Sequence, residues 1–411
     1  MNTLSISIAA LIIIISILFA PIQIFDPFHS VFQPIFNSVD TLASLQLRVV
    51  ETIRGSHLAT QPYNVEAQYP IPDETMSVSR AIRKVFLAVE QAEGAGAKVR
   101  RSIGTPQLRN FSPFLMLDHF SVKPGAGFPD QTEKRSRAGR YKQATVKAEL
   151  ENVELTKPPP LPTYSPHRGQ ETITYLLQGG IDHEDFAGNA GSLNPGDLQF
   201  MTAGRGIMHA EMPRQNADGS ANVGLQLWVD LPMELKLCEP RYRDLRASEI
   251  PQVTTDDGKV TIKVISGQSH GVDSVKDLAY TPVWILDVTM KPGSKMVQPL
   301  PEGWNAFAYT LEGDALFGDG ESKRKVEQYH NVVFEPEGTV VHVEVEPSAV
   351  KEARFVLVAG TPLNQPVVQY GPFVLNSKDD VYQAIMDYQG FANGFERGRD
   401  WESEIGKSMK H

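Results

Sequence analysis

The sequence is short of cysteine, of positive charge and of long helical repeats. Its one cysteine, Cys238, cannot form an internal disulfide, so the fold does not depend on an oxidising compartment. A net charge of −10 provides no general basic field for phosphates, which argues against direct binding to nucleic acid. With 411 residues, of which 41% are hydrophobic, the chain is not of the disordered, collagen-like or coiled-coil class. We expect a folded protein of the cytoplasm or nucleus.

The N-terminal segment stands apart from this description. Ile8–Phe19 is almost wholly apolar, and the first basic residue of the chain is Arg48. Residues 1–75 therefore form a hydrophobic segment and linker with three interpretations: an uncleaved signal anchor, a cleaved signal, or a non-native extension. Met76, a second plausible start, favours the last. If residues 1–25 are genuine, we expect a membrane-anchored protein.

Most of the remaining chain has the pattern of short strands. From Phe111 onward, short apolar runs alternate with turns rich in Gly, Pro, Asn and Asp, which predicts an all-β sandwich or barrel. Tyr175–Gly204 and Tyr309–Gly338 each read as a strand, a glycine turn, a polar excursion and a second strand. This weak repeat suggests two barrels that arose by duplication. Only the C-terminal stretch predicts a helix, capped by Ser377 or Asp379.

One cluster of residues has the chemistry of a metal site. His167 lies just before a strand, and His209 and Glu211 follow the turn Gly204–Gly206. Residues spaced i and i+2 on an extended segment point to one face, which is inward if that face lines a barrel. Two imidazoles and one carboxylate with open positions opposite suit non-haem Fe2+, but also other divalent transition metals. On spacing alone, three ordinary polar residues near strand ends are the alternative.

Several long motifs of this sequence resemble the pirin family of bicupins. The resemblance covers about Ser77 to Gly406 and implies two stacked cupin (jelly-roll) β-barrels with a short C-terminal helix. It implies an N-terminal, metal-binding barrel over residues 76–240 and a C-terminal barrel with the helix and no metal over residues 241–411. His167, His209 and Glu211 match three of the four family metal ligands, which normally hold iron. The motifs are SRAIRKVFLAVEQAEGAGAKVRRSIGT, FLMLDHF, PHRGQETITYLLQGGIDHEDFAGN, NPGDLQFMTAGRGIMHAEMP, GLQLWVDLP and GPFVLNSKDDVYQAIMDYQGFANGFERG.

The fourth ligand is where the sequence departs from the family. Ser165, the last residue of a charged insert over residues 131–165 that contains PPPLP near its end, stands at the position of the first family histidine. A neutral hydroxyl is a poor ligand beside imidazole, so two histidines and one carboxylate remain, with His119 or His183 as possible replacements. We hypothesise that the insert, like residues 1–75, is a retained intron or a gene-prediction error.

The second barrel lacks an equivalent set of ligands. His330 and His342 are 12 residues apart, and neither belongs to an HxH or HxE motif. The aromatic residues of the second barrel, and Trp228 of the first, are more simply explained as packing residues. Nothing beside Cys238 except Lys236 favours a thiolate. The residues predicted to pack are Trp228, Trp284, Trp304 and Phe307.

The resemblance implies two functions of different classes. The first is a quercetin 2,3-dioxygenase-like oxidoreductase with a flavonol substrate, in which Glu211 also accepts the proton of a substrate hydroxyl. The alternative is an iron-dependent, redox-sensing nuclear transcription cofactor that acts through a transcription-factor partner and does not bind nucleic acid directly. In both cases we expect a monomer.

Overall fold

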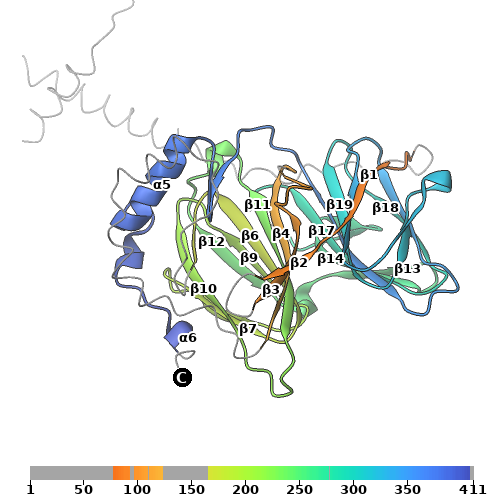
Figure 1. Ribbon diagram of the computed structural model, residues 1–411, viewed down its shortest axis with the longest axis horizontal. Helices are drawn as coiled ribbons and strands as arrows, with labels where there is room; N and C mark the ends of the chain where they lie inside the picture. The colour runs from red at the N-terminus through yellow and green to blue at the C-terminus, as the bar shows by residue number, and fades with distance from the viewer. Residues whose placement is uncertain (1–76, 93–96, 110, 124–164, 277, 408–411) are drawn as a thin grey trace, which may run out of the picture. The chain divides into compact units, whose positions relative to one another are not determined.

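The computed structural model contains two β-barrels, each built from one seven-stranded and one four-stranded sheet (Figure 1). This confirms the all-β class, the two cupin barrels and the short C-terminal helix predicted from the sequence. Residues 1–75 and most of the insert lie outside the described residues, so the interpretations placed on them stay predictions. The structure describes residues 77–92, 97–109, 111–123, 165–276 and 278–407.

The first barrel consists of two antiparallel sheets. Its small sheet, which carries the candidate metal ligands, has the strands β5 (Ser165–His167), β10 (Ile207–Pro213), β7 (Ile181–Asp185) and β8 (Ala190–Leu193), in that order. Its large sheet has the order β12 (Arg241–Leu245), β9 (Leu198–Thr202), β6 (Gln170–Gln178), β11 (Asn222–Asp230), β4 (Phe114–Val122), β3 (Lys98–Ile103) and β2 (Glu90–Ala92).

The second barrel repeats this plan strand by strand. Its large sheet has the order β1 (Ile82–Leu87), β22 (His330–Phe334), β19 (Asn305–Glu312), β24 (Ala353–Gly360), β17 (Val283–Met290), β14 (Val260–Ser266) and β13 (Gln252–Thr255). Its small sheet has the order β18 (Lys295–Pro299), β23 (Val340–Glu344), β20 (Ala315–Phe317) and β21 (Arg324–Val326). The repeat seen in the sequence carries β6 with β9 and β19 with β22, which occupy equivalent places in the two sheets, so the predicted repeat of the fold is confirmed.

Segments at both ends of the described chain cross between the barrels. Strand β1 lies early in the chain but pairs with β22 of the second barrel, and β12 follows residue 240 but pairs with β9 of the first. The C-terminal helix α5 (Lys378–Gly390) lies beside the first barrel (Figure 1). A division of the chain at residue 240 therefore does not separate the strands of the two barrels, because sheet edges take their partners from distant segments.

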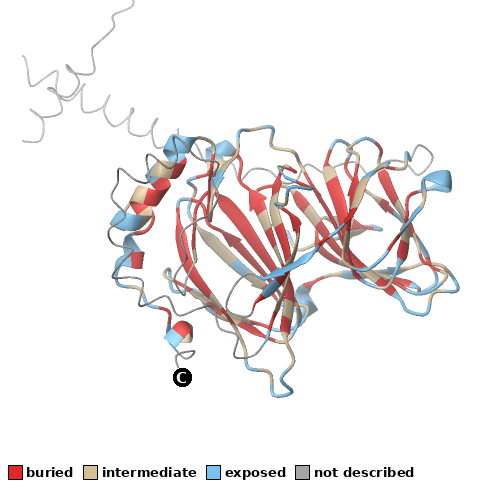
Figure 2. Ribbon diagram, in the orientation of Figure 1, coloured by how far each residue is buried: buried red, intermediate tan, exposed pale blue. Residues whose placement is uncertain are grey.

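The two barrels differ in what fills them. One apolar core joins the large sheets of both barrels and contains, for example, Phe114 and Phe200 of the first and Phe307 and Val358 of the second. A second core fills the inside of the second barrel, where buried residues line the strands (Figure 2). The second barrel is therefore closed by close-packed side chains, with Trp304 in this core and Trp284 packed against it, as predicted.

Helix α5 begins as the sequence predicts. The Ser377 hydroxyl caps it by accepting a hydrogen bond from the backbone N–H of Asp380 at 3.1 Å. Val381 and Ile385 are buried against the barrel, and Phe391, in the left-handed conformation, ends the helix. A shorter helix, α6 (Glu404–Lys407), and a small hairpin of β25 (Val368–Tyr370) and β26 (Phe373–Leu375) flank α5. Within the described residues, no helix has the length and hydrophobicity that a membrane span requires.

Four 3₁₀ turns and one further hairpin complete the described chain. The hairpin pairs β15 (Gln268–Ser269) with β16 (Val272–Asp273). The turns are η2 (Met233–Leu235), η3 (Ala247–Glu249), η4 (Gly320–Ser322) and η5 (Glu396–Arg399).

Candidate metal centre

Strand register brings the predicted ligands to one face of the small sheet. His209 on β10 lies opposite Ser165 on β5, and Glu211 on β10 lies opposite His183 on β7. Because alternate residues of a strand share a face, His167, His209 and Glu211 all point the same way. The rings of His167 and His209 meet edge to face with centroids 4.9 Å apart, and both side chains are buried. His167 and His209, 42 positions apart in the sequence, thus meet inside one barrel, and Glu211 lies two residues further along β10 on the same face.

Both imidazoles are neutral at pH 7. Burial, followed by the proximity of His209, lowers the pKa of His167 well below its ordinary value. Burial also lowers the pKa of His209, although the charge of Glu211 opposes this effect. A neutral imidazole has one ring nitrogen with a free lone pair, and this neutral form is the one that binds a metal ion.

The Nδ1 atoms of the two rings have different environments. Nδ1 of His167 lies 2.7 Å from Nε2 of Gln170. A half-turn of this amide places Oε1 there instead, so that it accepts the Nδ1 proton and leaves the Nε2 lone pair of the ring free. Nδ1 of His209 is buried and has no hydrogen-bond partner among the described residues. This orphaned nitrogen fits a site that is completed by a metal ion.

The Glu211 carboxylate is engaged by the opposite sheet. Its Oε1 accepts a hydrogen bond from the Thr174 hydroxyl at 3.2 Å, and its Oε2 accepts one from the Gln226 amide at 2.9 Å. In the part of the chain that the structure describes, no three His, Cys, Asp or Glu side chains are already grouped to hold a metal ion. Coordination by all three ligands therefore requires their side chains to come closer together, and each Glu211 oxygen keeps a second lone pair for this while it accepts its hydrogen bond.

The large sheet presents a polar wall to these ligands. Strand pairing aligns Gln226, Thr174, Gln199 and Asp244 in one row, and Trp228, Thr172, Met201 and Tyr242 in the next. The opposite face of the same strands belongs to the apolar core that joins the barrels. Inside the first barrel, several buried polar atoms lack partners among the described residues, including Oγ1 of Thr172 and Oε1 of Gln199. This interior differs sharply from the apolar filling of the second barrel.

Trp228 belongs to this site and not to the packing core predicted from the sequence. Its ring lies 5.2 Å from the ring of His167, and its Nε1 donates a hydrogen bond to Oε1 of Gln226 at 3.1 Å. Gln226 in turn holds Glu211. The prediction was wrong because an apolar residue in a strand was assigned to the core without regard to which face it occupies. The alternation of Gln226 and Trp228 with leucines was the available signal.

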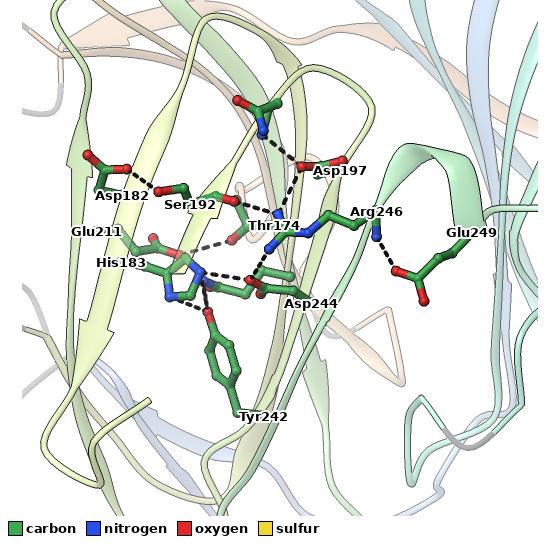
Figure 3. A network of polar contacts seen from close by, with 12 residues as sticks. Thr174, Asp182, His183, Ser192, Asp197, Glu211, Tyr242, Asp244, Arg246 and Glu249 are labelled. Atoms are coloured by element: carbon green, nitrogen blue, oxygen red, sulfur yellow. Dashed lines mark hydrogen bonds and ion pairs between the residues drawn. The ribbon is translucent and has the colours of Figure 1, made fainter. Parts of the chain in front are cut away.

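A second polar cluster lies beside Glu211 (Figure 3). The Tyr242 hydroxyl contacts the His183 ring, with 2.9 Å to Nε2, and accepts a hydrogen bond from the Gln199 amide. Asp244 lies 3.1 Å from the same Nε2 and is approached by Arg246. Burial, with the charges of Asp244 and Glu211, raises the pKa of Tyr242, so its hydroxyl stays protonated.

The two proposed replacement ligands are not equivalent. His119 lies opposite Leu225, on the face that packs between the barrels, and its Nδ1 contacts the Tyr309 hydroxyl at 3.1 Å. It is therefore not brought to His167 and His209, and that alternative is wrong. His183 lies on the correct face but is held by Tyr242 and Asp244. Cys238, whose pKa burial raises to about 11, stays a thiol, as expected.

Two family descriptions match this chain, one on each barrel. The Pirin family model matches residues 96–229, and the Pirin C-terminal cupin domain matches residues 285–394. Pirin from Homo sapiens is 43% identical over 332 residues, covering 80% of this chain and 100% of the relative. The chain belongs to the pirin family. A pirin-like protein from Solanum lycopersicum is 45% identical over 326 residues, covering 79% of this chain and 97% of the relative.

Solved structures share the fold of this pirin-family chain. A crystal structure of quercetin 2,3-dioxygenase from Acinetobacter baumannii superposes with a TM-score of 0.62 at 25% identity, covering 76% of this chain and 98% of the other. The crystal structure of GK1651 from Geobacillus kaustophilus superposes with a TM-score of 0.55 at 31% identity, covering 71% and 100%. The pirin-family bicupin fold thus extends over both barrels.

Proposed function

We propose that the first barrel binds one divalent transition metal, with Fe2+ as the native ion, through His167, His209 and Glu211. The observation that carries this proposal is the pair of neutral, buried imidazoles 4.9 Å apart inside a barrel lined with polar side chains. The second barrel offers a contrast within the same chain, because its interior is filled with apolar residues. Two imidazoles and a carboxylate leave positions open for other molecules.

We further propose a quercetin 2,3-dioxygenase-like activity for the metal-loaded protein. The similarity to the Acinetobacter baumannii quercetin 2,3-dioxygenase supports this reaction class, and bound Fe2+ would supply Lewis-acid and redox chemistry. The Glu211 carboxylate is the base that can accept a proton from a flavonol hydroxyl. Thr174 and Gln226 orient this carboxylate, and Trp228 provides a flat wall beside His167.

The proposal is tested by metal content and by oxygen-dependent loss of quercetin. Three full-length proteins are loaded anaerobically with Fe2+ and compared: the chain as written, H167A/H209A, and a form with residues 131–165 replaced by one histidine. We expect about one iron per chain in the repaired form, less in the chain as written, and none in the double variant. Equal iron in all three would overturn the site.

Turnover separates the two functions implied by the sequence. If the repaired form binds iron and consumes quercetin with oxygen, and E211Q removes turnover more than iron content, the enzymatic proposal is supported. Iron binding without loss of quercetin would overturn the dioxygenase activity. That outcome would leave the iron-dependent cofactor, which acts through a protein partner, as the function to test by measuring partner binding in the Fe2+ and Fe3+ states.

A further inference from the structure

Each of the two candidate histidines has a neighbour in the chain whose side chain points out of the barrel. On β10, Met208 precedes His209, and at the end of β5, Arg168 follows His167. Because successive strand residues face opposite ways, Met208 and Arg168 lie on the outer side of the small sheet. The outer side here is covered by the C-terminal segment that contains α5 (Figure 1).

Arg168 joins the sheet to that segment with its whole guanidinium group. Its Nη1 donates to Oδ2 of Asp387 on α5 at 2.7 Å, and its Nη2 donates to the backbone oxygen of Asn393 at 2.6 Å. Its Nε donates to the backbone oxygen of Arg205 at 2.6 Å, and the Phe395 ring lies 4.8 Å away. The side chains of Arg168 and Asp387 are only 4% and 5% exposed. This is a buried ion pair in which each guanidinium nitrogen donates a hydrogen bond, and removing one partner has a high free-energy cost.

Asp387 is itself held in place from its own segment. Its Oδ1 accepts hydrogen bonds from the Gln383 amide at 2.7 Å and from the Asn393 amide at 2.8 Å. Oδ1 thus has two donors from the C-terminal segment, and Oδ2 is left to accept from Arg168. Its position relative to α5 is rigid, so α5 offers Arg168 a preorganised acceptor.

Backbone contacts place the same segment directly against β5. The N–H of Val374 on β26 donates to the backbone oxygen of Arg168 at 3.0 Å, and the N–H of Arg168 donates to that of Pro372 at 3.4 Å. Strand β5 has only three residues and pairs within its sheet with β10 alone. A three-residue edge strand with one partner does not hold its side chains firmly, so this second attachment contributes to the position of His167.

Met208 makes the corresponding contact behind His209. It is fully buried in a cluster with Phe373, Ile385 and Phe395 of the C-terminal segment. Gly398 approaches so closely that a Cβ there would lie 2.2 Å from the Met208 sulfur. The segment therefore packs tightly behind both histidines.

We propose that the C-terminal segment is a positioning element for the metal site, in which the Arg168–Asp387 ion pair fixes His167 and the packing around Met208 fixes His209. The inference deepens the proposed function and rests on it. Ligands must be held to about 0.5 Å for productive binding, and supporting contacts on protein sites commonly change metal affinity by about 10–100-fold. Residues of the second half of the chain thereby set the geometry of a site in the first barrel.

The test uses the full chain, with Ser165 unchanged, and two variants of the Arg168–Asp387 ion pair, D387N and R168K. D387N keeps the shape of the side chain but removes its charge, and R168K keeps the charge but loses the planar fork. The matched control is D287N, which breaks another Asp–Arg pair, between the buried Asp287 and the partly exposed Arg354, away from the outer side of the small sheet. Each protein is titrated with Co2+, whose visible absorption reports coordination, and its thermal unfolding is recorded.

We expect D387N and R168K to raise the Co2+ dissociation constant at least about tenfold and to change the Co2+ spectrum. We expect all three variants to lower the unfolding temperature by similar amounts. D287N should nevertheless leave the Co2+ dissociation constant within about twofold of that of the parent protein. Weakened Co2+ binding in D287N equal to that in D387N would overturn the inference, since loss of stability alone would then explain it. Unchanged Co2+ binding in both D387N and R168K would also overturn the inference.

A second measurement keeps this inference separate from the metal proposal. Hydrogen–deuterium exchange at the imidazole C2 position, followed by mass spectrometry of peptides, reports His167 and His209 individually in metal-free protein. We expect faster exchange at His167 in D387N and R168K but not in D287N. If the unaltered chain binds no Co2+, the proposed function fails, and the exchange rates alone decide the inference: equal rates in all four proteins would refute it.

Discussion

Ser165 and His209 are register partners across β5 and β10, and both side chains point into the first barrel. Directly opposed residues of an antiparallel pair have Cβ atoms about 5 Å apart. His167, two residues along the same strand, has its ring 4.9 Å from that of His209. Ser165, at the position where the resemblance to the family predicts a histidine, therefore lies where a third imidazole would meet the other two.

Replacing this serine should strengthen metal binding. In S165H, the new imidazole adds a ligand beside His209, and we expect Co2+ to bind roughly tenfold more tightly or better, a gain of about 1.4 kcal/mol. The measurement is a Co2+ titration of the full chain at pH 7.5. S165A is the matched control and should bind like the parent. A histidine variant that binds no better than S165A would show that β5 cannot direct a side chain to the site.

The amide of Gln170 should set the tautomer of His167. It lies 2.7 Å from Nδ1 of that ring, and Q170L removes the polar partner while keeping most of the volume. We expect Q170L to weaken Co2+ binding by about tenfold, because supporting hydrogen bonds to ligand histidines orient the ring. Q170E provides an oxygen that accepts the Nδ1 proton and should bind within about threefold of the parent. Weaker binding in Q170E than in Q170L would contradict this role.

Acid should destabilise the metal-free protein partly through His119. Burial, with a smaller effect of the Arg100 charge, lowers the pKa of His119 to about 4, below the ordinary value of 6.5. The unfolded chain therefore binds the proton more readily, so stability is full above pH 6.5 and falls as the pH drops toward 4. This difference in pKa corresponds to roughly 3 kcal/mol.

The variant H119Q isolates that contribution. Free energies of unfolding from urea titrations at several pH values between 7 and 4 should fall less steeply for H119Q than for the parent. Both proteins are measured with a chelator present, so that metal release does not enter. Identical slopes would mean that His119 does not titrate differently in the folded and unfolded chains.

The apolar interior of the second barrel should contribute stability and not metal binding. Phe317 is fully buried, with the rings of Phe355 and Phe334 at 5.2 and 6.4 Å. We expect F317A to lower the free energy of unfolding by about 3–5 kcal/mol because it leaves a cavity. Co2+ affinity of the folded fraction should stay unchanged. V350A, at a side chain that is 97% exposed, is the control and should change stability by less than about 0.5 kcal/mol.

Strand alternation made much of the fold and part of the site predictable. The short apolar runs predict the strands, and the i, i+2 spacing of His209 and Glu211 predicts that they share a face, as they do. Family resemblance supplied the two barrels. The side chains that support the ligands were not predicted, because Gln170, Thr174 and Gln226 are common residue types whose role depends on the strand that each one faces.

The sequence by itself determined the strands, the turns between them and which residues share a face, because these follow from local periodicity and turn chemistry. Tertiary structure alone decided that Glu211 is held by the opposite sheet, that Trp228 lines the site, and that α5 lies behind the histidines. Arg168 and Asp387 are 219 residues apart, and no local pattern encodes such a pairing. It forms because a buried guanidinium and carboxylate, brought together by the packing of apolar faces, must satisfy each other's hydrogen bonds.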